Sequence, residues 1–425
     1  MNAKSVWSYE NRLLFILGLA FGICYFDRNA GTILVPFIEH DLQLNNTQVG
    51  FLGSGLSITW ALGAYLIARW SDAIGVRKPF LIAFLLIFSG CSFLSGLAPN
   101  FAVLLASRIV MGAVEGPFLP VCLAIMAIES SERRRGVNFG LMQNFFGSVL
   151  GQMLAPVVLV ALADRFGWRS AFYVAGVPGL LVLLAVVLWV REPGKAAQAG
   201  VDTAGLGGTG ARMGLFAMIG VRNIALCCVI SLFMVAWLVL GWTFLPKFFT
   251  DYRHFSPTVM GYVMGSLGAA SALSAFVVPA ISDRVGRKPA MIAFCLVGAL
   301  SPLAAIYFMG SVVVLGALMF VGWMACGTFP LFMGVIPTET ISRRYAATAM
   351  GIVVCVGEVV GGFGINSVAG VLADRFALTT PVLIQAACAL VGGVLGLALI
   401  ETAPSRVRAA AADRLAAEGL RRETG

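Results

Sequence analysis

The sequence predicts an all-helical membrane protein whose twelve transmembrane helices form two pseudo-symmetric six-helix halves. Composition is the first reason. The chain is 59% hydrophobic and only 12% charged, whereas a soluble globular domain carries roughly 25% charged residues. Long apolar segments recur along the chain, and motifs of its first half return in its second half. Most of the surface is therefore expected to meet lipid.

Twelve segments are apolar and long enough to cross a bilayer, which takes about 20 residues in a helix. They are too long for the strands of a membrane β-barrel and lack its alternation of apolar and polar residues. Because a helix satisfies its own backbone hydrogen bonds, we expect each segment to be helical. The segments are 12–37, 48–68, 79–97, 101–128, 136–163, 169–190, 222–249, 258–281, 290–310, 312–336, 346–373 and 380–400.

The second half repeats the first at an offset of 210 residues. Arg77-Lys78-Pro79 returns as Arg287-Lys288-Pro289, and the five letters of 162–166 return at 372–376. Two equivalent halves in an apolar chain favour a transporter whose substrate site lies between the repeats. The predicted parts are an N-terminal half (1–192), a cytoplasmic linker (193–215), a C-terminal half (216–403) and a cytoplasmic tail (404–425).

The net charge of +9 is concentrated in the loops on one side of the predicted bundle, whereas the opposite loops are short and mixed in charge. The positive-inside rule therefore places both termini and the linker in the cytoplasm, with the bundle in the plasma (inner) membrane. No basic cluster is attached to a soluble domain, which argues against a nucleic-acid partner. We expect a monomer in the lipid bilayer.

Cofactor, metal and enzyme chemistry find no support in the residues. The nine cysteines are scattered, no Cys-x-x-Cys pair occurs, and only two histidines are present. Gly205–Gly210 matches a dinucleotide-binding pattern, but no strand precedes it and no βαβ unit follows. Without a P-loop, a proton gradient rather than ATP is the expected driving force. We therefore expect no enzyme, no cofactor and no metal.

Charged loops recur on the predicted cytoplasmic side of both halves, after the second and the eighth segments, and matching charged residues follow the fourth and the tenth. A carboxylate at a helix end can accept hydrogen bonds from a neighbouring helix N-terminus and pair with arginines. Such loops can latch this side in one conformation; a charged turn that serves only topology is the alternative. The predicted gate consists of Asp72, Arg77, Lys78, Glu129, Arg133, Asp283, Arg287, Glu339 and Arg343.

The repeat breaks at four ionisable residues of the first half. A charged side chain inside the membrane is costly unless it is paired or hydrated, so it is functional by default. A cluster that only fixes helix packing is the alternative, but it would be a costly way to do so. The four are Asp27 and Arg28 in the first segment and Arg108 and Glu115 in the fourth, and their counterparts are Trp237, Leu238, Leu318 and Ala325.

These four residues can supply an anion anchor and a proton relay. Asp27 and Arg28 differ by ~100° around their helix, so we expect Asp27 to pair with Arg108 while Arg28 faces the cavity. Arginine is permanently charged and binds a carboxylate with two parallel hydrogen bonds. Asp27 and Glu115 can exchange protons. Arg108 completes the predicted proton-coupling group.

Further candidates lie at a similar depth. Glu358 is the only carboxylate deep in the C-terminal half, either linked to substrate or protons or buried beside a polar partner. For the aromatic candidates, packing against lipid is the alternative, and for the amides it is hydrogen bonding between helices. The remaining candidate substrate-binding residues are Tyr25, Trp60, Gln143, Trp242, Asn366 and Ser367.

The duplicated charged loops resemble the signature loop of the major facilitator superfamily. Asp27-Arg28, Arg108-x6-Glu115-Gly116-x3-Pro120 and Trp242-x3-Pro246 resemble its anion:cation symporter branch of sugar-acid and organic-anion carriers. The resemblance implies proton-coupled symport of a small organic acid by alternating access. It also implies that Arg28 binds the carboxylate, while Asp27 and Glu115 are linked to protons.

Two features depart from this branch. Trp60 and Gly63 stand where the branch would have Tyr and Gln, which favours an apolar or aromatic acid over a polyhydroxy sugar acid. Gly167-Trp168-Arg169, Val177-Pro178-Gly179 and Arg191-Glu192-Pro193 are similar to spinster-like lipid carriers. The alternative function is therefore an exporter of the same fold for lysolipid-like or drug-like substrates.

Overall fold

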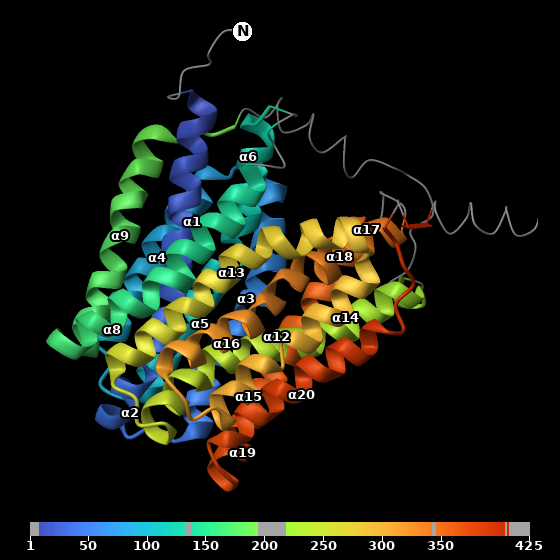
Figure 1. The fold of residues 1–425 in the computed structure, drawn as a ribbon. Helices are drawn as coiled ribbons and strands as arrows, with labels where there is room; N and C mark the ends of the chain where they lie inside the picture. The colour runs from blue at the N-terminus through green and yellow to red at the C-terminus, as the bar shows by residue number, and fades with distance from the viewer. Residues whose placement is uncertain are drawn as a thin grey trace, which may run out of the picture.

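The computed structural model describes residues 8–131, 134, 138–193, 218–341, 346–403 and 406–407. Within these residues, eleven helices are long and apolar enough to cross a membrane. The remaining predicted segment corresponds to α3 (Asn46–Ile74), a helix of 29 residues. Together with α3, these helices make up the predicted number of twelve. Figure 1 shows the helices running side by side as one bundle.

The N-terminal half (residues 8–193) holds the first six predicted segments, several of them built from two consecutive elements. Its elements are α1 (Tyr9–Ile33), α2 (Val35–Leu42), α3 (Asn46–Ile74), α4 (Lys78–Gly96), α5 (Phe101–Glu115), α6 (Phe118–Glu129), η1 (Leu141–Leu154), α8 (Ala155–Phe166) and α9 (Trp168–Trp189).

The C-terminal half (residues 218–403) follows the same order, with more breaks in its helices. Its elements are α12 (Arg222–Lys247), η2 (Phe248–Tyr252), α13 (Pro257–Val285), α14 (Arg287–Val297), α15 (Leu300–Tyr307), α16 (Val312–Trp323), η3 (Met324–Thr328), η4 (Leu331–Val335), α17 (Ile336–Thr340), α18 (Ala346–Val356), η6 (Gly357–Ile365), α19 (Asn366–Arg375) and α20 (Thr379–Gly396). The predicted linker and tail lie outside the described residues, apart from Pro193 and residues 406–407.

Local sequence explains where these helices begin and end. The Asn45 side chain accepts a hydrogen bond from the Gln48 backbone, and the Gln48 side chain accepts one from the Asn45 backbone, which makes a capping box for α3. Gly75 ends α3 in the left-handed region at φ 70°, where glycine carries no steric penalty. The next residues then start α4 with a proline in its first turn.

Two segments wind as π-helix near the middle of the bundle, at equivalent places in the repeat. They are η1 in the fifth predicted segment and η6 in the eleventh. Short π-helical stretches are rare and occur frequently at functional sites. Both segments contribute a polar side chain to the central cavity described below, Gln152 from η1 and Glu358 from η6.

We call the end of the bundle where α9 ends and α12 begins the linker end, and the opposite end, which contains α2, the distal end. The two halves pack closely at the distal end. A Cβ on Gly370 of α19 would lie 2.7 Å from the Asn46 carbonyl oxygen of α3. The halves also approach closely nearer the middle of the bundle, where a Cβ on Gly268 of α13 would meet the Gln152 backbone at 2.1 Å. Small residues allow this close packing between membrane helices.

Polar contacts between described residues of the two halves also lie at the distal end. Asp374, near the end of α19, accepts hydrogen bonds from the Asn46 N–H at 2.8 Å, the Thr47 N–H at 2.7 Å and the Thr47 hydroxyl. Lys247 of α12 forms an ion pair with Glu39 of α2. The Asn366 amide donates to the Gly50 carbonyl at 3.0 Å. The distal end is therefore closed.

Candidate functional site

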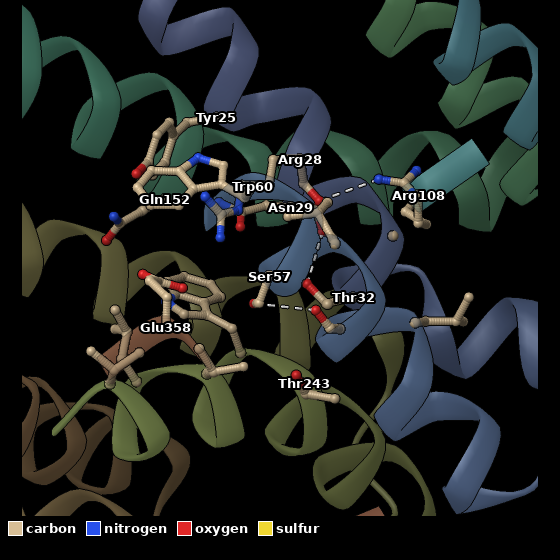
Figure 2. Close-up of a pocket in the computed structure, with 18 residues that line it drawn as sticks. Tyr25, Arg28, Asn29, Thr32, Ser57, Trp60, Arg108, Gln152, Thr243 and Glu358 are labelled. Carbon is tan, nitrogen blue, oxygen red and sulfur yellow. Dashed lines mark hydrogen bonds between the residues drawn. The ribbon is translucent and has the colours of Figure 1, made fainter. Parts of the chain in front are cut away.

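A central cavity of about 130 Å³ lies between the two halves (Figure 2). The N-terminal half contributes α1, α3, α5 and η1 to its wall, and the C-terminal half contributes α12 and η6. The lining of the cavity is mostly apolar, and it includes aromatic rings, one carboxylate and two arginines. The lining residues are Tyr25, Arg28, Asn29, Gly31, Thr32, Leu52, Gly53, Leu56, Ser57, Trp60, Arg108, Gln152, Val235, Leu238, Val239, Trp242, Thr243 and Glu358.

Arg28 carries a positive charge between two aromatic rings of this cavity. Its guanidinium carbon lies 5.5 Å from the centroid of the Tyr25 ring and 5.5 Å from that of the Trp60 ring. Such rings attract a cation through their faces and leave its N–H groups available. The Arg28 side chain makes no hydrogen bond or ion pair with the described residues. It is therefore free to bind an anion in the cavity.

Asp27 points away from Arg28, into the N-terminal half, and is fully buried. One of its carboxylate oxygens accepts a hydrogen bond from the Ser92 hydroxyl of α4. Its other oxygen is buried and has no hydrogen-bond partner among the described residues. The side chains of Asp27 and Arg28 thus lie in different surroundings, as their angular separation on α1 predicts.

The predicted ion pair between Asp27 and Arg108 is not formed. Arg108 instead donates to the backbone carbonyls of Asp27 and Arg28, at 3.5 and 3.4 Å. Gly31 allows this approach, because a Cβ there would lie 2.8 Å from the guanidinium carbon. Arg108 also lies over the Phe172 ring, at 5.0 Å from its centroid. It therefore holds the backbone of the functional part of α1.

Glu115 is buried at the end of α5, with 2% of its surface exposed. Neither of its carboxylate oxygens has a hydrogen-bond partner in the described part of the chain. A Cβ on the adjacent Gly116 would lie 2.0 Å from the Trp60 carbonyl oxygen, so α5 and α3 touch at this point. An ionised carboxylate is costly in such surroundings. Its role in proton coupling stays a prediction.

The C-terminal half faces Arg28 with Trp242 and Glu358. Glu358 lines the cavity, and its Oε2 is buried without a hydrogen-bond partner among the described residues. Trp242 packs edge-on against Trp323, with centroids 5.8 Å apart. Trp237, the counterpart of Asp27, is fully buried and donates to the Gly298 carbonyl at 3.0 Å. It serves the packing of this half.

Two predicted binding residues, Asn366 and Ser367, do not line the cavity. The Asn366 side chain bonds to Gly50 of α3 at the contact between the halves. The Ser367 hydroxyl donates to the Phe363 carbonyl of its own helix at 2.7 Å. The Gln143 side chain lies outside the described residues. The first two fail because the π-helical turn of η6 rotates the helix face that follows it.

Several polar lining residues were not singled out from the sequence as cavity residues. Thr32 lies one helical turn after Arg28, so helical periodicity could have indicated it. The Asn29 amide faces η1 and donates to the Gly151 carbonyl at 2.7 Å. Gln152 is visible as a polar residue in an apolar run. Ser57 and Thr243 give no clear sequence signal, since small hydroxyl residues are common in membrane helices.

At the linker end, the helices that begin at two of the predicted gate loops are each capped by a carboxylate of the same half. Glu192 accepts the Arg77 and Lys78 N–H groups, both at 2.7 Å, and so caps α4. In the C-terminal half, Glu401 accepts the Arg287 and Lys288 N–H groups at 2.8 and 3.1 Å. The two carboxylates thus occupy equivalent places in the repeat.

Arg287 is the centre of the C-terminal network. It donates to Asp283 at 2.5 Å and binds Glu339 through two nitrogens, at 3.0 and 3.3 Å. In the N-terminal half, Glu129 is the last residue of α6. Arg133, Arg343 and the side chain of Asp72 lie outside the described residues.

Two similar membrane-spanning halves around a central cavity define a membrane transporter, not an enzyme. Comparison with known proteins identifies the family. The model of the Major Facilitator Superfamily matches residues 17–365 and again residues 225–422. The chain belongs to the Major Facilitator Superfamily.

Several transporters are similar in sequence. The probable 4-methylmuconolactone transporter of Cupriavidus pinatubonensis is 26% identical over 362 residues, which is 83% of this chain and 81% of that protein. The hexuronate transporter of Bacillus subtilis is 30% identical over 181 residues, which is 42% of this chain and 41% of that protein. The match to the hexuronate transporter thus spans less than half of either chain.

Solved structures share the fold. A bacterial homologue of the human lysosomal transporter Spinster has a TM-score of 0.74 at 18% identity, covering 92% of this chain and 95% of that chain. A D-xylose–proton symporter has a TM-score of 0.74 at 17% identity, covering 93% and 99%. At these identities the similarity shows the fold alone.

Proposed function

We propose that the protein is a proton-coupled symporter for a small organic anion and works by alternating access. The observation that carries this proposal is Arg28, an unpaired cation in a cavity between the halves. Arginine is the side chain best suited to bind a carboxylate in a low-dielectric site. Relatives named for 4-methylmuconolactone, hexuronate and sulfoacetate support an organic acid as the substrate.

The proton coupling rests on the two buried carboxylates of the same half. Asp27 and Glu115 each keep at least one oxygen without a hydrogen-bond donor. Because an ionised carboxylate is costly in such surroundings, proton uptake can accompany substrate movement. No ATP-binding motif offers another driving force. The proton gradient is thus the proposed one.

The distal end faces the outside of the cell in this proposal, and the linker end faces the cytoplasm. The excess of arginine and lysine in the linker-end loops supports this orientation. The bonds between the halves at the distal end support assigning this conformation, within the proposal, to the inward-facing side of the transport cycle.

A spinster-like lipid exporter is the alternative. The fold similarity to a Spinster homologue does not favour it, since sugar symporters are equally similar. The cavity of about 130 Å³ is close to the volume that encloses one benzene ring in an engineered protein cavity. A cavity of this size favours a small acid.

Arg28→Ala tests the anchor in proteoliposomes supplied with labelled organic acids. Uptake should fall by about 100-fold or more, because two charge-assisted hydrogen bonds to the carboxylate are lost. Arg28→Lys should restore only part of the rate, since lysine lacks the two-pronged geometry. Arg165→Ala, at an exposed arginine outside the cavity, is the matched control. Normal uptake by Arg28→Ala would exclude Arg28 as the anchor.

A further inference from the structure

Glu358 supplies the one carboxylate among the described lining residues of the cavity. Its Oε2 is buried and unbonded among the described residues, and the carboxylate forms no ion pair with Arg28. Figure 2 shows Glu358 entering from the C-terminal half, whereas Arg28, Tyr25 and Trp60 enter from the N-terminal half. The two charged groups therefore belong to opposite walls.

The Glu358 side chain is only partly buried and lines the cavity, so a donor on the occupant, or a proton, can stabilise a carboxylate that has no ion pair there. Aromatic rings line both sides of the cavity among aliphatic side chains, with Tyr25 and Trp60 from one half and Trp242 from the other. Such surfaces suit a flat ring. The volume of about 130 Å³ has room for an occupant of about one ring.

We propose that Glu358 accepts a hydrogen bond from a hydroxyl group on the substrate, and that it selects ring carboxylates carrying such a donor. This inference rests on the proposed function, in which Arg28 holds the carboxylate at the other wall. Binding then joins the two halves through one molecule: the carboxylate binds α1 and the hydroxyl binds η6. Glu358 is accordingly a specificity-determining residue.

Binding of benzoate, 3-hydroxybenzoate, 4-hydroxybenzoate and 4-methoxybenzoate to the purified full-length protein tests this. At least one hydroxybenzoate should bind about tenfold or more tightly than benzoate, since benzoate leaves a buried acceptor unpaired. The methoxy compound, which cannot donate, should bind no better than benzoate. This comparison uses the wild-type protein alone, so it does not depend on how a variant folds.

Two variants then assign the preference to Glu358. Glu358→Ala should bring the hydroxybenzoate and benzoate affinities to within about twofold of each other, because the acceptor is gone. Glu358→Gln keeps a carbonyl acceptor of the same size and should retain part of the preference. A Glu358→Ala protein that keeps the full preference would overturn the assignment.

The outcomes separate this inference from the proposed function. Equal binding of benzoate and both hydroxybenzoates by the wild type would overturn the role of Glu358, while the organic-anion function would stand. The wild type could instead show no hydroxyl preference while Glu358→Gln changes the pH dependence of carboxylate binding. That result would make Glu358 a proton carrier and overturn the inference. Failure of every carboxylate to bind would overturn the organic-anion function itself.

Discussion

The two halves of the molecule are alike at the linker end and unlike around the cavity. At the linker end, Glu192 and Glu401 cap equivalent helices through equivalent N–H groups. Around the cavity, the N-terminal half has Asp27 and Arg28 where the C-terminal half has Trp237 and Leu238. The repeat thus conserves the parts that hold each half together.

This difference separates two requirements of a transporter. Both halves must move as similar rigid bodies, so the helix caps that stabilise each body are duplicated. Binding and coupling need charges at one place only, and every buried charge in a membrane is costly. The N-terminal half therefore carries most of the proposed chemistry, and the C-terminal half adds a largely apolar wall with Glu358.

Glu115→Gln tests the asymmetry with the largest expected effect, since its counterpart Ala325 cannot carry a proton. We expect proton-gradient-driven accumulation to be abolished while exchange of internal for external substrate continues, because exchange requires no net proton movement. Both are measured in the same proteoliposomes, so exchange is the internal control for folding. Full accumulation by this variant would remove Glu115 from the proton path.

The distal end provides a second asymmetry. Asp374 caps α3 at Asn46 and Thr47, whereas α13 begins at Pro257, which has no N–H to donate to Asp164, the counterpart of Asp374. Asp374→Ala should raise hydrogen exchange at the start of α3 by about tenfold, since three hydrogen bonds between the halves are lost. Asp164→Ala is the matched control and should leave exchange at the start of α13 unchanged. Equal effects would mean that both carboxylates hold the distal end.

The linker-end caps should behave alike. Glu192→Gln and Glu401→Gln each weaken hydrogen bonds to two N–H groups at a helix start, and we expect each to cost about 1 kcal/mol of stability. Thermal unfolding of both variants in detergent measures this. Lys195→Gln, in the predicted linker, is the control and should have no effect. A loss confined to one of the two glutamates would contradict the equivalence of the halves at this end.

The smallest expected effect concerns pH at the distal end. Burial raises the pKa of Glu39 to about 7, although the Lys247 ammonium lowers it. When the distal end opens and Glu39 reaches water, its pKa should return towards its ordinary value of 4.5. The closed end therefore binds the proton more strongly, so it is favoured as pH falls from 7 towards 4.5 and loses this contribution as pH rises through 7.

Hydrogen exchange of α2 measured across this pH window, after correction for the intrinsic pH dependence of exchange, tests the role of Glu39. The wild type should become more protected as pH falls, and Glu39→Gln should remove this trend. The counterparts of Glu39 and Lys247 are Phe249 and Phe37, so the C-terminal half offers no equivalent pair. An unchanged trend in Glu39→Gln would assign it to another group.

The sequence was sufficient to predict the helices, because about 20 apolar residues in a row have few other stable structures in a membrane. It also indicated the cavity residues Arg28 and Glu358, as charges inside membrane segments, and Trp60, as an aromatic residue at a similar depth. The placement of Asn366 could not be predicted, because a π-helical turn precedes it and changes which face it occupies.

Contacts between distant segments were also beyond the sequence. The bonds from Asp374 to α3 join residues more than 300 positions apart, and no local pattern indicates them. The same holds for Arg108, whose hydrogen bonds to backbone carbonyls depend on the space beside Gly31. An ion pair with Asp27 was expected because the sequence shows opposite charges but not which atoms can meet.

Uptake of labelled organic acids into proteoliposomes, with and without an inward proton gradient, tests the central claim most directly. We expect at least one small ring carboxylate to accumulate above its equilibrium level only when the gradient is present. Dissipating the gradient with a protonophore should abolish this accumulation. Uptake that is indifferent to the gradient would contradict proton coupling. The absence of any carboxylate uptake, with lipid or drug export instead, would contradict the organic-anion function.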